Sequence, residues 1–152
     1  MKIISSILVF LSFSLCASMV VMAQNVPSLP EKAESIVKSK NPHWKLVRKE
    51  ERGKQVNLLF GPDKADVVLT VFTGATAQEA ADRMNAAFKM LSVGPGKKRS
   101  DIGDEAYFWK DESTGFAGIR FRKANVYVDV SAPSLAIAEE LAKSLAQEIP
   151  KQ

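Results

Sequence analysis

The sequence predicts an α+β fold, an antiparallel β-sheet with helices on one face, in the order α-βββα-βββα. Residues 106–131 and 55–73 each alternate apolar and polar side chains, as half-buried strands do. Residues 77–91 and 137–149 instead repeat apolar residues every three or four positions, which is typical of amphipathic helices. No linker or low-complexity segment divides the chain, so we expect one domain.

The C-terminal hairpin has the clearest pattern. With Lys123-Ala124 as a two-residue turn, Phe121 faces Val126 and Ile119 faces Val128, which puts the apolar side chains on one face. The opposite face carries a polar set: Gly118, Arg120, Arg122, Asn125, Tyr127 and Asp129. We expect this polar face to meet water, with Arg120 opposite Tyr127. A binding face is the alternative.

The first hairpin spans residues 55–73, and its expected pairs are Phe60 with Val67, Leu58 with Leu69 and Val56 with Val71. Its opposite face presents an apolar set where the C-terminal hairpin is polar: Leu59, Val68 and Phe72. Either the N-terminal helix covers these side chains, or they form an exposed patch that marks a binding site.

A further strand is expected at residues 106–110, where Tyr107 and Trp109 alternate with Ala106 and Phe108. The two aromatic side chains would extend the apolar patch or pack under a helix.

Capping boxes mark the starts of two helices. Ser28 with Glu31 begins a helix that Asn41-Pro42 ends, and Thr76 with Glu79 begins the helix of residues 77–91. A strand at residues 43–50 follows the first helix, and a last helix begins near Pro133.

The two halves of the chain resemble each other. Residues 65–71, ADVVLTV, align with residues 124–130, ANVYVDV, and a helix follows each segment. This match has two possible explanations, an internal duplication or convergent patterning of two strands. A duplication would make the two helices that follow these segments equivalent.

The N-terminus has the pattern of a signal peptide. Lys2 precedes an apolar run over residues 3–15, and Val21-Met22-Ala23 provides small residues before Gln24. We expect cleavage after Ala23, leaving residues 24–152 as the mature domain. A lipoprotein signal would use Cys16, but Leu15 stands where a small residue is expected. Serines interrupt the apolar run, which disfavours a membrane span.

Cleavage would remove Cys16, the single cysteine, so the mature domain would have neither a disulfide nor a thiol. Loss of Lys2 from the 21 basic residues leaves 20 against 17 acidic ones. This balance does not favour nucleic-acid binding. We expect the mature protein in the periplasm or outside the cell, not spanning a membrane.

No catalytic, cofactor or metal motif is present. His43 is the single histidine, and no cluster of histidines and cysteines suggests zinc. Asp101, Asp104 and Glu105 do not have the spacing of a calcium loop. The segment of residues 94–99, GPGKKR, lacks the spacer and the Ser or Thr of a phosphate-binding loop. We expect it to be a solvated basic loop, with contact to an anionic surface as the alternative.

The segments GDEAY at residues 103–107 and FRKANV at residues 121–126 resemble a pattern in small bacterial exported proteins of unknown function. In those proteins the last turn is often Arg-Lys-Gly-Asn, and here Ala124 stands at the glycine position. The resemblance covers the last third of the chain. It implies an exported α+β domain and no particular activity.

We therefore expect an exported, non-enzymatic binding or interaction module without a cofactor. Its candidate binding residues are Leu59, Val68, Phe72, Tyr107, Trp109, Arg120 and Tyr127. One alternative is a carrier that holds a small apolar ligand between the sheet and the helices. A second is a hydrolase that uses Asp104 or Glu105, whose activity should disappear when both acids become alanine.

Overall fold

A computed structural model describes residues 28–63, 66–90 and 94–151. The expected signal peptide, residues 1–23, and its cleavage position lie outside these described residues, as does Cys16.

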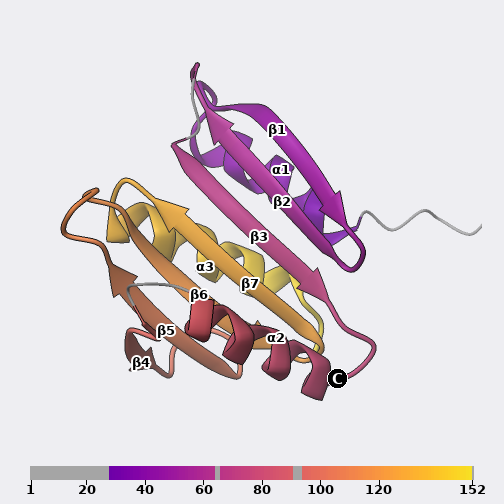
Figure 1. Cartoon of the computed structure of the whole chain (residues 1–152). Helices are drawn as coiled ribbons and strands as arrows, with labels where there is room; N and C mark the ends of the chain where they lie inside the picture. Colours follow the sequence, from indigo (N-terminus) through magenta and orange to yellow (C-terminus); the bar gives the residue numbers. More distant parts are fainter. Residues whose placement is uncertain (1–27, 64–65, 91–93, 152) are drawn as a thin grey trace, which may run out of the picture.

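The described residues form three helices and seven strands (Figure 1). In chain order these are α1 (Leu29–Lys40), β1 (Lys45–Arg52), β2 (Gln55–Gly61), β3 (Val67–Thr73), α2 (Ala77–Met90), β4 (Lys97–Arg99), β5 (Glu105–Lys110), β6 (Ala117–Lys123), β7 (Val126–Ala132) and α3 (Leu135–Glu148). The α+β class and the order α-βββα-βββα are confirmed. The one added element is β4, a short strand at Lys97–Arg99 where the sequence suggested a loop.

All strands belong to one antiparallel sheet with the order β1-β2-β3-β7-β6-β5-β4. The two halves meet where β3 pairs with β7, with Leu69 opposite Val130 and Val71 opposite Val128. The two three-strand groups therefore share a single continuous sheet.

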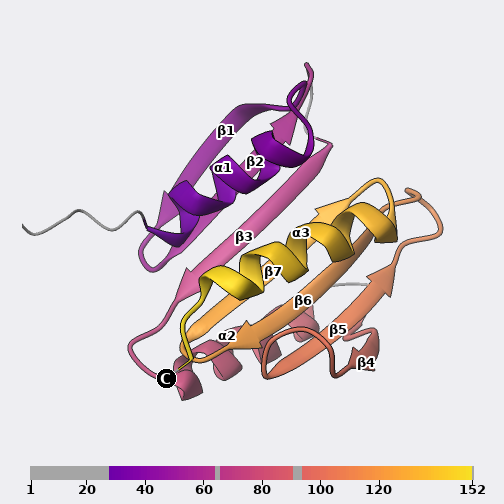
Figure 2. The ribbon, with the colours of Figure 1, turned by 180° about the vertical axis from the view of Figure 1, so that it is seen from behind.

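Helices α1 and α3 cover one face of the sheet, which we call the inner face (Figure 2). Every second residue of the central strands points into this layer and is fully buried, including Phe60, Leu69, Phe121 and Val128. From the helices, Val37, Leu141 and Leu145 complete the core. Burial of each such side chain contributes about 1.5–3 kcal/mol, so this layer is the main source of stability.

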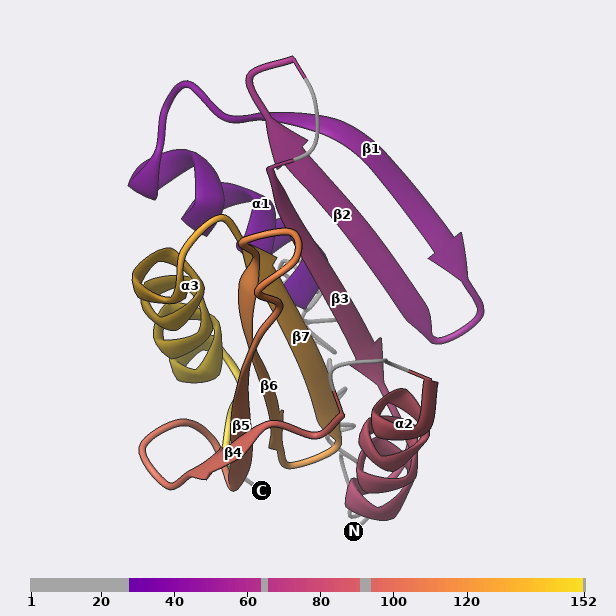
Figure 3. The same ribbon diagram turned by 60° about the vertical axis from the view of Figure 1, so that its left-hand side comes forward.

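Helix α2 lies on the opposite face, which we call the outer face (Figure 3). The expectation that all helices share one face is therefore wrong for α2. The apolar stripe of α2, with Ala80, Met84 and Ala87, packs on Tyr127 of β7. Because α3 already occupies the inner face over β6 and β7, α2 finds its apolar contact on the outer face.

The pairs predicted for β2 and β3 are confirmed: Phe60 lies opposite Val67, Leu58 opposite Leu69 and Val56 opposite Val71. The pairing predicted for β6 and β7 is two residues out of register. Phe121 lies opposite Val128, and the two turn residues are Ala124 and Asn125. A shift of two residues leaves every side chain on its predicted face, since strands alternate with period two.

The turn itself explains the shift. Ala124 has a φ of +51°, a left-handed conformation that suits a tight hairpin turn and that alanine rarely adopts. The Asp104 carboxylate accepts a hydrogen bond from the Ala124 N–H at 2.7 Å. This contact from outside the hairpin holds alanine in a position typical of glycine.

The strands of the two halves are related by an approximate two-fold arrangement, because residues 68–71 of β3 pair with residues 128–131 of β7 and the aligned segments meet there. The helices that follow them do not share this relation, since α2 and α3 lie on opposite faces (Figure 3). The two helices are thus not equivalent, and an internal duplication stays a prediction.

Candidate functional site

All seven residues predicted for binding lie on the outer face of the sheet. Strand pairing arranges this face in rows that cross the sheet. One row contains Leu59, Val68, Ser131, Gly118 and Trp109. The next, which we call the polar row, contains Asn57, Thr70, Asp129, Arg120 and Tyr107, and the third contains Gln55, Phe72, Tyr127, Arg122 and Glu105.

Helix α2 divides the predicted residues into two groups. Tyr127 is buried beneath α2, and Phe72 and Tyr107 pack around it. The ring of Phe88 meets Tyr107 edge to face, with 5.0 Å between the centroids. Leu59 and Val68 stay half-buried and lie outside this cluster. Cover by the N-terminal helix is wrong for Leu59, Val68 and Phe72, because α1 packs on the inner face.

Arg120 is fully buried in the middle of the polar row. Its Nε donates to Asp129 Oδ2 at 3.0 Å, and its Nη1 donates to the carbonyl oxygen of Gly94 at 2.8 Å. The guanidinium also lies over the rings of Trp109 and Phe88, at 5.0 and 6.0 Å from their centroids. The expected solvated face is wrong here, and Arg120 lies opposite Asp129 rather than Tyr127.

Asp129 shares this buried environment. Burial raises the pKa of the Asp129 carboxyl, while the charge and the hydrogen bond of Arg120 act against that rise. The Tyr127 hydroxyl donates a long hydrogen bond, 3.4 Å, to Asp129 Oδ2. Asp129 Oδ1 and Trp109 Nε1 are both buried, and the Trp109 side chain also acts against the rise in the Asp129 pKa. The Asp129 carboxyl is therefore surrounded by hydrogen-bond donors from β6, β5 and its own strand: Arg120, Trp109 and Tyr127.

A cavity of about 180 Å³ opens beside Asp129, between α2 and the polar row. Its lining combines two strands with the helix: Thr70, Tyr127 and Asp129 from the sheet, and Arg83, Ala87 and Met90 from α2. Arg83 lies over the Tyr127 ring at 5.8 Å from its centroid and donates to Gln55 Oε1 through Nε at 2.9 Å. Met90 is 80% exposed at the rim.

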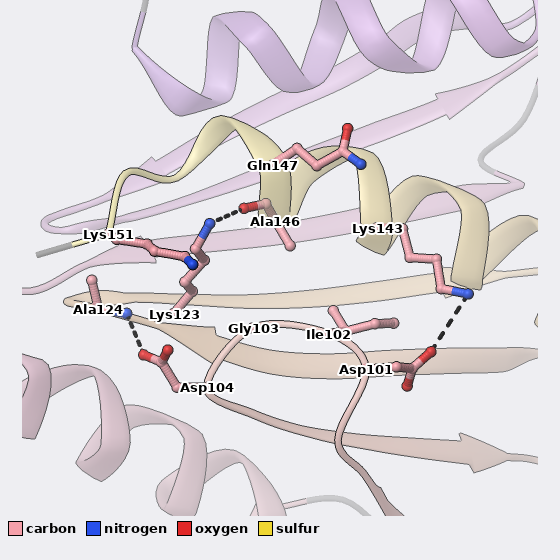
Figure 4. A pocket seen from close by; sticks show the side chains of 10 residues that line it. All are labelled: Asp101, Ile102, Gly103, Asp104, Lys123, Ala124, Lys143, Ala146, Gln147 and Lys151. Carbon is pink, nitrogen blue, oxygen red and sulfur yellow. Dashed lines mark hydrogen bonds and ion pairs between the residues drawn. The ribbon is translucent and has the colours of Figure 1, made fainter.

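A larger cavity of about 540 Å³ lies at the end of α3 (Figure 4). Two of its three lysines have partners within the fold: the Lys123 ammonium donates to the carbonyl oxygen of Ala146, and Lys143 pairs with Asp101 at 3.5 Å. The opposite wall is the loop of residues 101–104, where Gly103 has a φ of +62° and a side chain would strike the Arg122 carbonyl. The charges around this cavity serve mainly to hold the loop to α3.

The other candidate residues take structural positions. Asp101 pairs with Arg99, and both hydrogen bonds of that fork are below 3 Å. Asp104 caps the hairpin turn as described above, and Glu105 accepts a hydrogen bond from the Tyr107 hydroxyl at 2.8 Å. His43 is exposed in the turn before β1. Over the described residues, no three acidic, histidine or cysteine side chains are grouped to hold a metal ion.

Three polar residues of the cavity beside Asp129 were not among the predicted binding residues: Thr70, Arg83 and Asp129. Asp129 was expected in water, since nothing local in β7 indicates cover by a helix from the other half of the chain. One feature of the sequence could have indicated this cavity. Arg83 stands four residues before Ala87, a residue of the apolar stripe of α2, so its long cationic side chain lies at the edge of the face that packs on the sheet.

Comparisons of this chain with protein-family models, with curated proteins and with solved structures found no match. No helix in the described part of the chain has the length and apolar character needed to cross a membrane.

Proposed function

We propose that this protein is an exported, non-enzymatic binding module that recognises a partner through the bare outer face. By bare outer face we mean the outer surface of β1, β2 and β3 that α2 leaves uncovered, centred on Leu59 and Val68. The observation that carries the proposal is that these two aliphatic side chains lie opposite each other, half-buried, without a helix over them. Exposed aliphatic patches with a polar rim are typical of interaction sites.

The edges of the sheet are poorly suited to pair with a strand of a partner. We therefore place the binding site on the face of the sheet. Edge strand β1, KLVRKEER, is almost entirely charged beyond its first residues and has an irregular register between Leu46 and Arg48. The other edge, β4, is three residues long with the sequence KKR. Charged, short and irregular edges are the features by which proteins prevent strand addition.

Charged residues border the bare outer face on the β1 side. Arg48 and Glu50 point to the outer face, and Arg48 Nη2 lies 2.6 Å from Glu50 Oε1. A polar rim of mixed sign around an aliphatic centre is the usual anatomy of a protein interface. This arrangement supports a protein partner over a lipid surface, which would favour a rim of one sign.

A carrier of a small apolar ligand is the second candidate function, and one cavity favours it. An apolar cavity of about 350 Å³ lies where the start of α1 meets the end of α3, lined by Leu29, Pro30, Val126, Ile149 and Pro150 among others. This volume is at the lower end of the range of about 300–1,000 Å³ found for ligand sites. Native mass spectrometry of the mature protein from its exported fraction distinguishes the two, since only a carrier retains a small molecule of defined mass.

We propose no reaction for Asp104 and Glu105. Each carboxylate accepts a hydrogen bond that holds a turn or an aromatic side chain in place, at 2.7 and 2.8 Å. A catalytic acid or base instead needs a free proton position within reach of a substrate.

The test introduces a charge into the bare outer face. Leu59→Glu and Val68→Glu should leave the fold intact, because both side chains are partly exposed, and should abolish capture of the partner by chemical crosslinking in the exported fraction. Ala136→Glu is the matched control, since Ala136 is exposed in the first turn of α3 on the other face. Phe72 is not used, because it packs against the cluster beneath α2.

Two results would contradict the proposal. Crosslinking that survives both substitutions would show that the partner binds elsewhere. Unfolding by either substitution would show that Leu59 and Val68 belong to the core. Export is tested separately by N-terminal sequencing of the secreted protein, where Gln24 is the expected first residue.

A further inference from the structure

The cavity at the end of α3 contains two lysines that no acid of the described residues neutralises. Lys123 comes from the end of β6 and Lys151 from the segment after α3, and both line the cavity. In Figure 4 their ammonium groups extend toward the same end of the cavity, beside Ala146. Within the described part of the chain, neither lysine forms an ion pair with a carboxylate. This end of the cavity therefore has an excess of positive charge, which attracts an anion.

The two acids that line the cavity are already balanced by other cations. Asp101 accepts two hydrogen bonds from Arg99, at 2.8 and 2.7 Å. Asp104 Oδ2 lies 3.5 Å from Arg122 Nη1 and also accepts the hydrogen bond of the hairpin turn. The third lysine of the cavity, Lys143, pairs with a carboxylate of its own helix at 2.9 Å. The charges that remain without a counterion are those of the two lysines described above.

Lys123 keeps hydrogen-bond donors for a ligand. Its Nζ donates to the Ala146 carbonyl oxygen at 2.6 Å, and an ammonium group has three N–H donors. Ala146 lies in the last turn of α3, where the negative end of the helix dipole stabilises a cation without removing its charge. This contact fixes the position of the Lys123 ammonium at the cavity. Lys151 is exposed, and no described residue accepts a hydrogen bond from its ammonium.

Charge and size together indicate the class of the ligand. A phosphate monoester carries about −1.5 to −2 charges near pH 7 and has three acceptor oxygens, which matches two ammonium groups with free N–H donors. Lysine is a common phosphate ligand, because it acts as a point charge that needs no fixed plane. The volume of about 540 Å³ lies within the range of about 300–1,000 Å³ found for ligand sites, so an organic group fits beside the phosphate.

We infer that this cavity binds a small soluble organic phosphate monoester, with its phosphate group between the ammonium groups of Lys123 and Lys151. The cavity shares no residue with the bare outer face. The inference goes beyond the proposed function. Leu59→Glu should leave phosphate binding unchanged, so either site can fail without the other.

The experiment titrates the exported form of the protein with small probes and follows its backbone N–H signals by NMR. Glycerol 3-phosphate is a monoester, dimethyl phosphate is a diester with a single negative charge, and glycerol has no charge. Glycerol 3-phosphate should shift the signals of Gly103, Lys123 and Ala124. It should bind at least about tenfold more tightly than dimethyl phosphate, because the diester has one charge and one acceptor oxygen fewer for the two lysines.

Substitutions of the two lysines test their assigned role. Lys151→Gln should weaken glycerol 3-phosphate binding by about fivefold or more, since it removes one of the two charges. Lys89→Gln is the matched control, because Lys89 is also an exposed lysine without an ion pair among the described residues, and it lies in α2 outside the cavity. Lys123→Gln should weaken binding further, and Lys151→Gln carries the test if that variant does not fold.

Three results would overturn the inference. The first is equal binding of glycerol 3-phosphate and dimethyl phosphate, or no shift of the cavity signals at the highest concentration that the protein tolerates. The second is an equal loss of binding in Lys151→Gln and Lys89→Gln, which would show attraction by general positive charge. The third concerns the source of the phosphate: binding to phosphatidylcholine vesicles that contain phosphatidic acid, without binding of glycerol 3-phosphate, would show a lipid surface as the ligand.

Discussion

Arg120 of β6 and Asp129 of β7 lie directly opposite each other and form an ion pair, with 3.0 Å between Nε and Oδ2, beneath helix α2. Only 1% of the Arg120 side chain and 17% of the Asp129 side chain are exposed. A buried pair of this kind gains little net stability, but each partner compensates the charge of the other.

Arg120→Leu should therefore destabilise the protein by about 3–5 kcal/mol, because it leaves the Asp129 charge buried without a partner. Urea unfolding followed by circular dichroism measures the change. The double variant Arg120→Leu with Asp129→Leu is the control and should cost clearly less, since both charges are removed together. If the free energy of unfolding of Arg120→Leu lay within about 1 kcal/mol of the parent value, as expected for an exposed ion pair, the burial of this pair would be contradicted.

Ala124→Gly should stabilise the protein by about 0.5 kcal/mol. The left-handed conformation of Ala124, with a φ of +51°, costs alanine roughly 1–2 kcal/mol, which glycine avoids, and the greater freedom of glycine in the unfolded chain offsets part of this gain. Ala124→Val should destabilise the protein, because a branched side chain fits this conformation worse. Thermal unfolding of both variants measures the effect. If Ala124→Gly were less stable than the parent protein, the proposed backbone strain at Ala124 would be contradicted.

Gly118→Ala should destabilise the protein by about 1–3 kcal/mol and displace Trp109. The indole of Trp109 lies against Gly118 so closely that an added Cβ would overlap it. Fluorescence reports the displacement, since the chain has two tryptophans and Trp44 lies at the other end of the sheet. Thr114→Ala, in an exposed turn, is the control. Unchanged tryptophan emission in Gly118→Ala would contradict the contact.

Arg99→Gln should raise the pKa values of two carboxyls. The hydrogen bonds of Arg99 lower the pKa of Asp101 from 3.8 to about 2 and that of Glu139 from 4.5 to about 2. Because folding lowers both values, these groups stabilise the fold above about pH 4, and that contribution is lost as the pH falls toward 2. NMR titration of the two carboxyls measures the change, and Arg99→Gln should show a smaller loss of stability between pH 5 and pH 2.

Lys143 also contacts both carboxyls, so Lys143→Gln is the matched comparison and should have a smaller effect than Arg99→Gln. The order follows from Arg99 being the larger cause of the lowered pKa of each group. Equal effects of the two substitutions would contradict the dominant role of Arg99.

The two tyrosines should not ionise in the folded protein near the usual pH of about 10. Burial raises the pKa of Tyr127, and the hydrogen bond to Glu105 raises that of Tyr107. Since the unfolded chain loses these protons first, stability should fall as the pH rises above about 10. Absorbance near 295 nm measures phenolate, which should appear together with alkaline unfolding; a gradual rise at lower pH in the folded protein would contradict this.

The sequence predicted the inner half of the molecule well, because one physical pattern governs it. Residues that alternate with period two, such as Leu58 and Phe60 or Ile119 and Phe121, are buried against α1 and α3 whatever the exact register. The turn of the C-terminal hairpin was misplaced, since the contact that selects it comes from Asp104, a residue outside the hairpin.

The outer face was harder to predict, because its cover comes from a helix of the other half. The stripe of α2 predicts a buried face but does not say which side of the sheet it meets. The predicted binding residues do all lie on this face, yet Asp129 and Thr70 were missed, since a polar strand residue has the same pattern in water as beneath a helix. Only the packing of α2 over this face, with Phe88 against Arg120, separates the two environments.

The pairing of β3 with β7 also covers an edge that would otherwise favour association between chains. β3 is the apolar strand VVLTVFT; β2 pairs with one of its edges, and β7, which pairs with the other, follows α2, β4, β5 and β6 in the chain. Until β7 pairs with it, β3 has an open edge without charges, the kind of surface on which chains aggregate. A chain that ends near Met90 should therefore form insoluble assemblies.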